Sequence, residues 1–280
     1  MNGRNIILTG IPRSGTTLCC NLMGKAGNTV ALFEPMPVHL LPLDHGLAVE
    51  EVSQFFSASR SSLVTTGRAA SYQADGQVPD NPFGESRGAT GLRTRQVALG
   101  EIQVGKPLSA DFTLVVKHNA AFTALLGVLV ERFEAYAVIR NPLAVLASWN
   151  SVELPVRHGR LPAGERLDTE LKRRLDGEPD RLARQIMLLD WMLGIFASVM
   201  PPDRIIRYES LVESQGQSLA ELTRLAVPTL ETSSRNSSVL YDAAACAGYA
   251  QRLRDSAGKW RYYYSDRDIA FALEGLLGAQ

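Results

Sequence analysis

Long apolar runs are missing from this sequence: no stretch approaches the roughly 20 apolar residues that a membrane-spanning helix requires. A surplus of charge is missing too, because 29 basic residues balance 29 acidic ones. No overall field therefore favours nucleic acid or an anionic membrane as a partner. The chain also enters its first apolar stretch at Asn5, which leaves no room for a signal peptide.

Cysteine and histidine are scarce. An odd count of three cysteines, with Cys19 and Cys20 adjacent, does not suggest a disulfide framework. The four histidines are scattered and have no cysteine or carboxylate partners at ligand spacing, so no metal site is expected. Together these absences predict a cytoplasmic chain in a reducing compartment, with no metal, no nucleic acid and no membrane among its partners.

What is present fits an α/β domain, since 280 residues with 45% hydrophobic content can bury a sizeable core. Predicted strands cover residues 5–9, 29–33, 112–116, 135–139 and 204–208. Predicted helices cover residues 16–26, 49–62, 122–132, a segment from 142, 167–175, 181–200, 218–225 and 266–276. This alternation predicts a central parallel sheet flanked by helices on both faces. The segment 65–109 is rich in Gly, Pro and Asp and is expected to be irregular, either a lid or disordered.

The most informative stretch is Gly10–Thr17, with the sequence GIPRSGTT. It joins the first predicted strand to the first predicted helix, so its backbone N–H groups converge at the positive end of a helix dipole and attract an anion. The spacing is that of a P-loop, but Thr16 stands where such loops carry a lysine, and Arg13 supplies the cation instead. An anion other than ATP with magnesium is therefore expected.

The polar residues of interest follow predicted strands: they are Arg13, Glu34, Lys117, Arg140 and Tyr208. In parallel sheets, ligands bind at the carboxyl ends of the strands. Residues far apart in the sequence are thus expected to meet at one edge of the sheet and to form a single site.

Residues 12–17 resemble the loop of sulfotransferases that binds the 5′-phosphosulfate of 3′-phosphoadenosine 5′-phosphosulfate (PAPS). The segment Arg140–Trp149 resembles the 3′-phosphate motif of the same family. The resemblance implies a P-loop three-layer α/β fold, with Arg13, Ser14, Gly15, Thr16 and Thr17 on the 5′ side of the donor. It further implies that Arg140 and Ser148 hold the 3′-phosphate.

Two later segments extend the resemblance, which covers residues 5 to about 261 but not the irregular stretch. Residues 207–212 resemble a family segment in which a tyrosine, here Tyr208, approaches the adenosine. Residues 256–261 resemble a Gly-Lys/Arg-Trp stretch that folds over the nucleotide, so Lys259 is expected near the 3′-phosphate. Lys117 resembles the lysine that contacts the transferring sulfuryl group.

Two residues compete as the base that accepts the acceptor's proton. Glu34 stands where some family members carry a catalytic glutamate, and His118 follows Lys117 as a catalytic histidine does in others. Because side chains alternate along a strand, Lys117 and His118 should point in opposite directions, which favours Glu34. Nearby Arg13 and Lys117 are expected to keep Glu34 ionised, while partial burial raises its basicity.

The resulting hypothesis is a single sulfotransferase domain spanning residues 1–280, with a variable lid or acceptor-binding region at about 38–109. It transfers a sulfuryl group from PAPS to a hydroxyl or amine of a small-molecule acceptor and releases 3′,5′-diphosphoadenosine (PAP), without a metal. The alternatives are a P-loop small-molecule kinase and a catalytically inactive nucleotide-binding module. Neither the acceptor nor the oligomeric state follows from the sequence.

Overall fold

The chain folds around a parallel sheet. The computed structural model describes residues 3–84, 91–231 and 241–278. The strands of the sheet are β1 (Asn5–Gly10), β2 (Thr29–Phe33), β5 (Thr113–Lys117), β6 (Glu134–Ile139) and β7 (Ile205–Arg207). They lie in the order β2-β5-β1-β6-β7 and every neighbouring pair is parallel. This is the α/β architecture that the alternation of strands and helices predicts.

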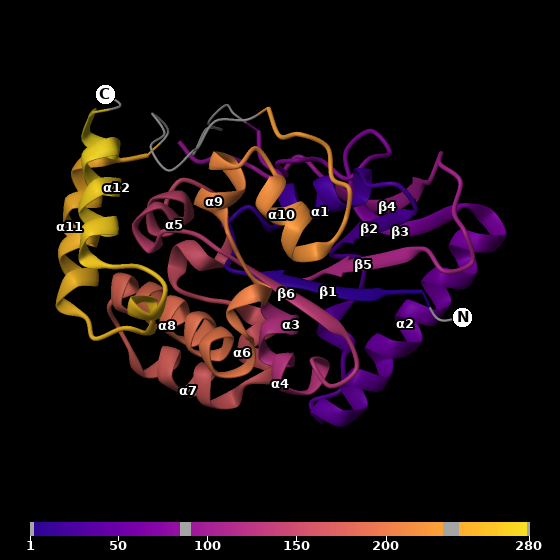
Figure 1. The fold of residues 1–280 in the computed structure, drawn as a ribbon. Coiled ribbons are helices and arrows are strands. Elements are labelled where there is room, and N and C mark those ends of the chain that lie inside the picture. The colour runs from indigo at the N-terminus through magenta and orange to yellow at the C-terminus, as the bar shows by residue number, and fades with distance from the viewer. Residues whose placement is uncertain (1–2, 85–90, 232–240, 279–280) are drawn as a thin grey trace.

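Helices cover both faces of the sheet (Figure 1). One face carries α1 (Thr16–Lys25), α9 (Tyr208–Glu213) and α10 (Gln217–Thr223). The other carries α2 (His45–Thr66), α3 (Ala120–Ala124), α4 (Leu126–Leu129), α6 (Pro162–Leu167), α7 (Thr169–Gly177) and α8 (Arg181–Val199). At one end of the molecule, α5 (Pro142–Trp149) packs against α11 (Ala243–Asp255) and α12 (Asp266–Gly278).

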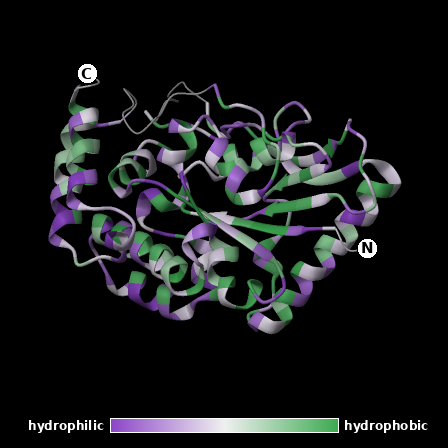
Figure 2. Ribbon diagram, viewed as in Figure 1, coloured by the Kyte–Doolittle hydropathy of each residue, from purple (hydrophilic) through white to green (hydrophobic). Residues whose placement is uncertain are grey.

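Alternation along the strands divides the core into two layers. In β1, Ile6 and Leu8 pack in the layer with α1, whereas Ile7 packs in the layer with α2 and α3. Successive side chains of a strand point to opposite faces, so each strand supplies both layers. In Figure 2 the outer helices α2 and α8 alternate between hydrophobic and hydrophilic residues, as expected for helices that cover a core on one side.

The region predicted to be irregular contains a hairpin, so that expectation is wrong for part of it. Strands β3 (Arg68–Gln73) and β4 (Ala98–Gln103) pair antiparallel in a separate two-stranded sheet. The hairpin is tied to the main sheet where the Phe33 N–H donates to Ser71 Oγ at 2.9 Å, and Ser71 is fully buried. Residues 85–90 of the predicted lid lie outside the described residues.

Other element boundaries differ as well. The helix predicted over 122–132 is divided into α3 and α4, and α6 lies in a segment for which no helix was predicted. Tyr208 begins α9 and does not end β7. Three-residue and four-residue 3-10 helices complete the described chain: η1 (Val38–Leu40), η2 (Pro155–His158), η3 (Pro202–Arg204) and η4 (Lys259–Tyr262).

In the part of the chain that the structure describes, α8 is long and apolar enough to span a membrane by length and composition. The expectation that no stretch approaches that length is therefore too strict. Leu188, Leu189 and Met192 of α8 are fully buried in the core, and a core helix of a soluble protein passes the same test.

Candidate functional site

The loop between β1 and α1 is held in a left-handed conformation at two positions. Arg13 has φ 70° and Gly15 has φ 94°, and Gly15 is the N-cap of α1. A Cβ at Gly15 would lie 2.8 Å from the ring of Tyr208, so glycine is required both for the turn and for this close approach. Ser14 Oγ donates to the Val138 carbonyl at 2.8 Å, which anchors the loop to β6.

A cavity of about 330 Å³ opens above this loop. Five residues at or just after the carboxyl ends of the strands line it: Arg13, Glu34, Lys117, Arg140 and Tyr208. The carboxyl ends of the parallel strands therefore bring together residues that the sequence separates widely. Gly15, Thr16, Thr17 and His118 also line the cavity.

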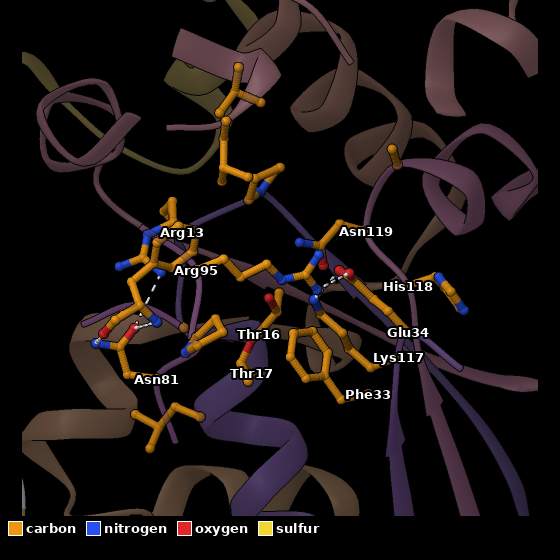
Figure 3. Close-up of a pocket in the computed structure, with 18 of the residues that line it drawn as sticks. Arg13, Thr16, Thr17, Phe33, Glu34, Asn81, Arg95, Lys117, His118 and Asn119 are labelled. Carbon is orange, nitrogen blue, oxygen red and sulfur yellow. Dashed lines mark hydrogen bonds and ion pairs between the residues drawn. The ribbon is translucent and has the colours of Figure 1, made fainter. Parts of the chain in front are cut away.

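In the cavity, the Glu34 carboxylate forms ion pairs with two cationic side chains. Its Oε1 accepts a hydrogen bond from Lys117 Nζ at 2.7 Å, and its Oε2 accepts one from Arg95 Nη2 at 3.1 Å. Figure 3 shows both cationic side chains converging on this carboxylate. Lys117 is 2% exposed, so the pair that it forms with Glu34 is largely shielded from solvent.

The basicity of Glu34 differs from the expectation. Burial by itself favours the protonated carboxyl, but Lys117 above all, and then His118 and Arg95, outweigh it and lower the pKa of Glu34 to about 2. The second cation is Arg95 and not Arg13, whose guanidinium lies elsewhere in the cavity (Figure 3). With both cations in place the carboxylate is ionised but is a weak base.

Backbone geometry explains why Glu34 meets Lys117. Phe33 packs in the layer with α1, so simple alternation would turn Glu34 toward the opposite layer. Glu34 instead has φ 46°, an unusual conformation for a residue other than glycine, and its carboxylate lies on the side of Lys117. The Lys117 ammonium lies 4.6 Å from the centre of the Phe33 ring.

His118 points away from this ion pair, as alternation along β5 predicts (Figure 3). Its Nε2 accepts a hydrogen bond from the Met36 N–H at 3.1 Å, and its ring packs edge-on against Phe122 with 5.0 Å between ring centres. Burial lowers the pKa of His118 to about 3, with Lys117 adding to the effect. His118 is therefore a neutral, buried histidine.

Arg140 lies on the far side of the loop and is 4% exposed. It donates through Nη1 to the Arg13 carbonyl at 3.1 Å and through Nη2 to the Tyr241 hydroxyl at 3.4 Å. Its guanidinium also stacks 4.5 Å from the centre of the Tyr208 ring. Although Tyr241 is buried, which by itself raises the pKa of its hydroxyl, the Arg140 charge holds that pKa below its ordinary value.

Arg13 links the two motifs that the sequence singles out. Its Nε donates to Ser148 Oγ at 3.3 Å, and its Nη1 donates to Asn81 Oδ1 at 3.4 Å. Its guanidinium lies 4.4 Å from the centre of the Phe83 ring. The loop arginine thus contacts both α5 and the segment between β3 and β4.

Three predicted donor-binding residues do not line the cavity. Ser14 and Ser148 are fully buried, and their hydroxyls bond to Val138 and Arg13 respectively. Lys259 is exposed on η4, which packs against α8, and its N–H donates to Asp190. The tail therefore does not bring Lys259 to the cavity.

Sequence reasoning missed Arg95, Asn81 and Tyr241, all of which line the cavity. Arg95 and Asn81 lie in the segment predicted to be irregular, where no periodicity assigns a direction to a side chain. Tyr241 lies two residues before α11, a helix that was not predicted. These residues are brought to the site only by the tertiary fold.

No protein-family model matches the chain, and no curated protein matches its sequence. Among solved structures, it is similar to a sulfotransferase domain from the curacin biosynthetic pathway, with 14% identity over 80% of this chain and 73% of that one, and a TM-score of 0.42. Sulfotransferase STF1 from Mycobacterium tuberculosis H37Rv is 13% identical over 99% and 77% of the two chains, with a TM-score of 0.39. Sulfotransferase STF9 from Mycobacterium avium is 13% identical over 100% and 77%, with a TM-score of 0.35.

Proposed function

We propose that this chain is a sulfotransferase that uses PAPS as sulfuryl donor. One observation carries the proposal: a single cavity contains both the loop with its cation at Arg13 and the ion pair of Glu34 with the buried Lys117. The loop offers an anion site at the N-terminus of α1. The pair offers a base and a cation beside it.

The cavity suits a donor with phosphate at both ends of its nucleoside. Arg13, Thr16, Thr17 and the N–H groups of the loop face the 5′-phosphosulfate. Arg140, buried in the cavity wall beside Tyr241, supplies a cation for the 3′-phosphate. Tyr208 covers Gly15 and offers a ring against which the adenosine can pack.

The reaction we propose is an in-line displacement at sulfur. The acceptor's oxygen or nitrogen forms a bond to sulfur while the bond from sulfur to the bridging oxygen of the 5′-phosphate breaks. The electron pair of the broken bond stays on that oxygen, so PAP is the leaving group. The acceptor's proton passes to the Glu34 carboxylate. By analogy with phosphoryl transfer, positioning and charge stabilisation carry most of the catalysis, and Arg13 and Lys117 supply that charge.

The acceptor we propose is a small molecule with a hydroxyl or an amine. One part of the cavity wall is apolar and comes from η1, the segment around η2, and α6: it contains Val38, Leu154, Pro155, Val156, Leu161, Pro162 and Ala163. That wall can hold the body of an acceptor whose nucleophile faces Glu34. Three buried cysteines, all free in the described structure, suit a cytoplasmic setting.

The kinase alternative is less well supported, since Thr16 stands at the position where a nucleoside-triphosphate enzyme needs its lysine. The experiment that tests the function is a screen of hydroxyl and amine acceptors with PAPS labelled in the sulfuryl group, run in excess EDTA and again with Mg²⁺. Labelled product at equal rates in both conditions is expected. Labelled product that forms only with Mg²⁺ would contradict metal-independent transfer, and no labelled product in either condition would contradict the proposed function.

A further inference from the structure

Arg95 is a cation in the cavity to which neither the motifs nor the proposed reaction gives a role. It lies between residue 91 and β4, at the edge of the hairpin. Its guanidinium is held 3.9 Å from the centre of the Tyr72 ring and 5.5 Å from that of Phe33. Figure 3 shows its side chain reaching across the cavity toward Glu34 and Lys117.

Arg95 and Lys117 approach the same carboxylate on different oxygens. Both cations therefore lie within reach of one small region of the cavity, next to the P-loop hydroxyls of Thr16 and Thr17. Arg95 is 32% exposed at its side chain, whereas Lys117 is 2% exposed, so Arg95 has more room to turn. An anionic ligand in this region competes with Glu34 for both.

We propose that Arg95 contacts the transferring sulfuryl group, exchanging its bond with Glu34 for bonds to the donor's sulfate oxygens when the donor binds. The inference rests on the proposed function. Hydrogen bonds from guanidinium N–H groups to anionic oxygen are among the strong ones, so the exchange keeps Arg95 paired. It also removes one of the two cations bonded to Glu34, which raises the basicity of that carboxylate.

The charged groups around Glu34 are consistent with this exchange. Lys117 and His118 lie at the end of β5, and Arg95 approaches from the hairpin side. The thiol of Cys20 on α1 also interacts electrostatically with Glu34 and Lys117. His118 is held neutral. The low pKa of Glu34 depends mainly on Lys117, with smaller contributions from His118 and Arg95, and it rises when Lys117 or Arg95 turns to another anion.

A pair of ligands that differ only in the sulfuryl group tests the proposal. Affinities of PAPS and PAP are measured by calorimetry for the unmodified chain, Arg95→Met, Arg95→Lys and the control Arg68→Met. Arg68 is an exposed arginine of the same hairpin, on β3, paired with Glu101. PAP has no sulfuryl group, so its binding also reports whether each variant has folded its donor site.

Arg95→Met is expected to weaken PAPS binding by about tenfold or more while PAP binding stays within about twofold, because one charge-assisted contact is lost. Arg95→Lys should recover part of the loss, and Arg68→Met should change neither affinity. Glu34→Gln should tighten PAPS more than PAP, since it releases both cations.

Equal effects of Arg95→Met on PAPS and PAP, or no effect on either, would overturn the proposal and leave Arg95 as a structural partner of Glu34. If the unmodified chain binds neither ligand, the proposed function itself fails, and this inference fails with it. Binding of PAP by the unmodified chain separates these two outcomes.

Discussion

At the scale of single residues, Glu34 is the group on which the proposed chemistry depends most. Glu34→Gln keeps the shape of the side chain and removes its basicity, so we expect the transfer rate to fall by about 10²–10⁴-fold. PAP affinity should stay within about twofold, because a carboxylate contributes nothing favourable to binding an anion. Steady-state transfer from labelled PAPS and calorimetry with PAP measure the two effects.

The matched control for this change is Glu213→Gln, which removes the same charge from an exposed position on α9. It should leave the rate unchanged. His118→Gln should be much milder than Glu34→Gln, because the imidazole faces Met36 and Phe122. An inactive His118→Gln beside a fully active Glu34→Gln would reverse the assignment of the base.

Arg140 is expected to bind the 3′-phosphate of the donor. Arg140→Ala should cost on the order of 1.5–3 kcal/mol in PAP affinity, the range for hydrogen bonds to a charged group. The affinity for adenosine 5′-phosphosulfate, which lacks the 3′-phosphate, should fall by less. Because Arg140 also donates to the Arg13 carbonyl, part of the loss is shared by both ligands. Equal losses in calorimetry would mean that Arg140 only supports the loop.

His118 makes stability depend on pH. Its pKa falls from 6.5 in the unfolded chain to about 3 in the folded one. The unfolded state therefore binds the proton first, and stability that is present above pH 6.5 is lost as the pH falls toward 3. Glu34, with its pKa lowered from 4.5 to about 2, adds a loss of the same sign below about pH 4.5.

Urea unfolding between pH 7 and 4.5 isolates the histidine. The unfolding free energy of the unmodified chain should fall over this range, by on the order of 1–3 kcal/mol. His118→Gln, which keeps an acceptor for the Met36 N–H, should flatten that dependence, and the control His39→Gln, at an exposed position on η1, should not. If the unfolding free energies of both variants depended on pH as steeply as that of the unmodified chain, His118 would not be a buried, neutral histidine.

Residue roles could be predicted where strand periodicity sets direction. The opposite orientations of Lys117 and His118 follow from alternation, and the structure agrees. The side on which Glu34 lies does not follow from alternation, because its positive φ breaks the regular geometry of a strand. The value of its pKa could not be predicted either, since Arg95 reaches it from 61 positions away in the chain.

At the scale of elements, the hairpin of β3 and β4 positions Arg95. Ser71 Oγ accepts the Phe33 N–H in a fully buried contact between the hairpin and β2. Ser71→Ala leaves that N–H unpaired, and we expect it to lower the unfolding free energy by about 1–3 kcal/mol. Urea unfolding measures this, with Ser57→Ala on the exposed side of α2 as the control.

A Ser71→Ala chain as stable as the unmodified one would show that the hairpin is held by other contacts.

The hairpin itself was not predictable, because its strands have the sequences RAASYQ and ALGEIQ. Alanine, glycine and glutamate are depleted in strands. The turn signal Asp75-Gly76 closes a local turn between Ala74 and Gln77, so it does not join β3 to β4, which a long connection separates. By contrast, the central strands are short, continuous apolar runs bounded by polar residues, and the sequence predicts all of them.

At the scale of the whole molecule, the parallel sheet brings the ends of its strands to one edge, and the cavity forms there. This convergence was predictable from the alternation of strands and helices alone. What it binds depends on details of charge: Arg13 is the cation of the loop, Arg140 is buried in the wall, and Lys117 pairs with Glu34.

Calorimetry of the unmodified chain with PAP and, separately, with ATP and Mg²⁺ decides whether the cavity takes a 3′-phosphorylated donor. PAP is expected to bind at least about tenfold more tightly, because Arg140 has a 3′-phosphate to pair with and the loop lacks the lysine that ATP requires. Tighter binding of ATP with Mg²⁺ would contradict the proposed donor and favour a kinase. Absence of binding by either nucleotide would contradict it as well, leaving a fold of this class without the proposed donor site.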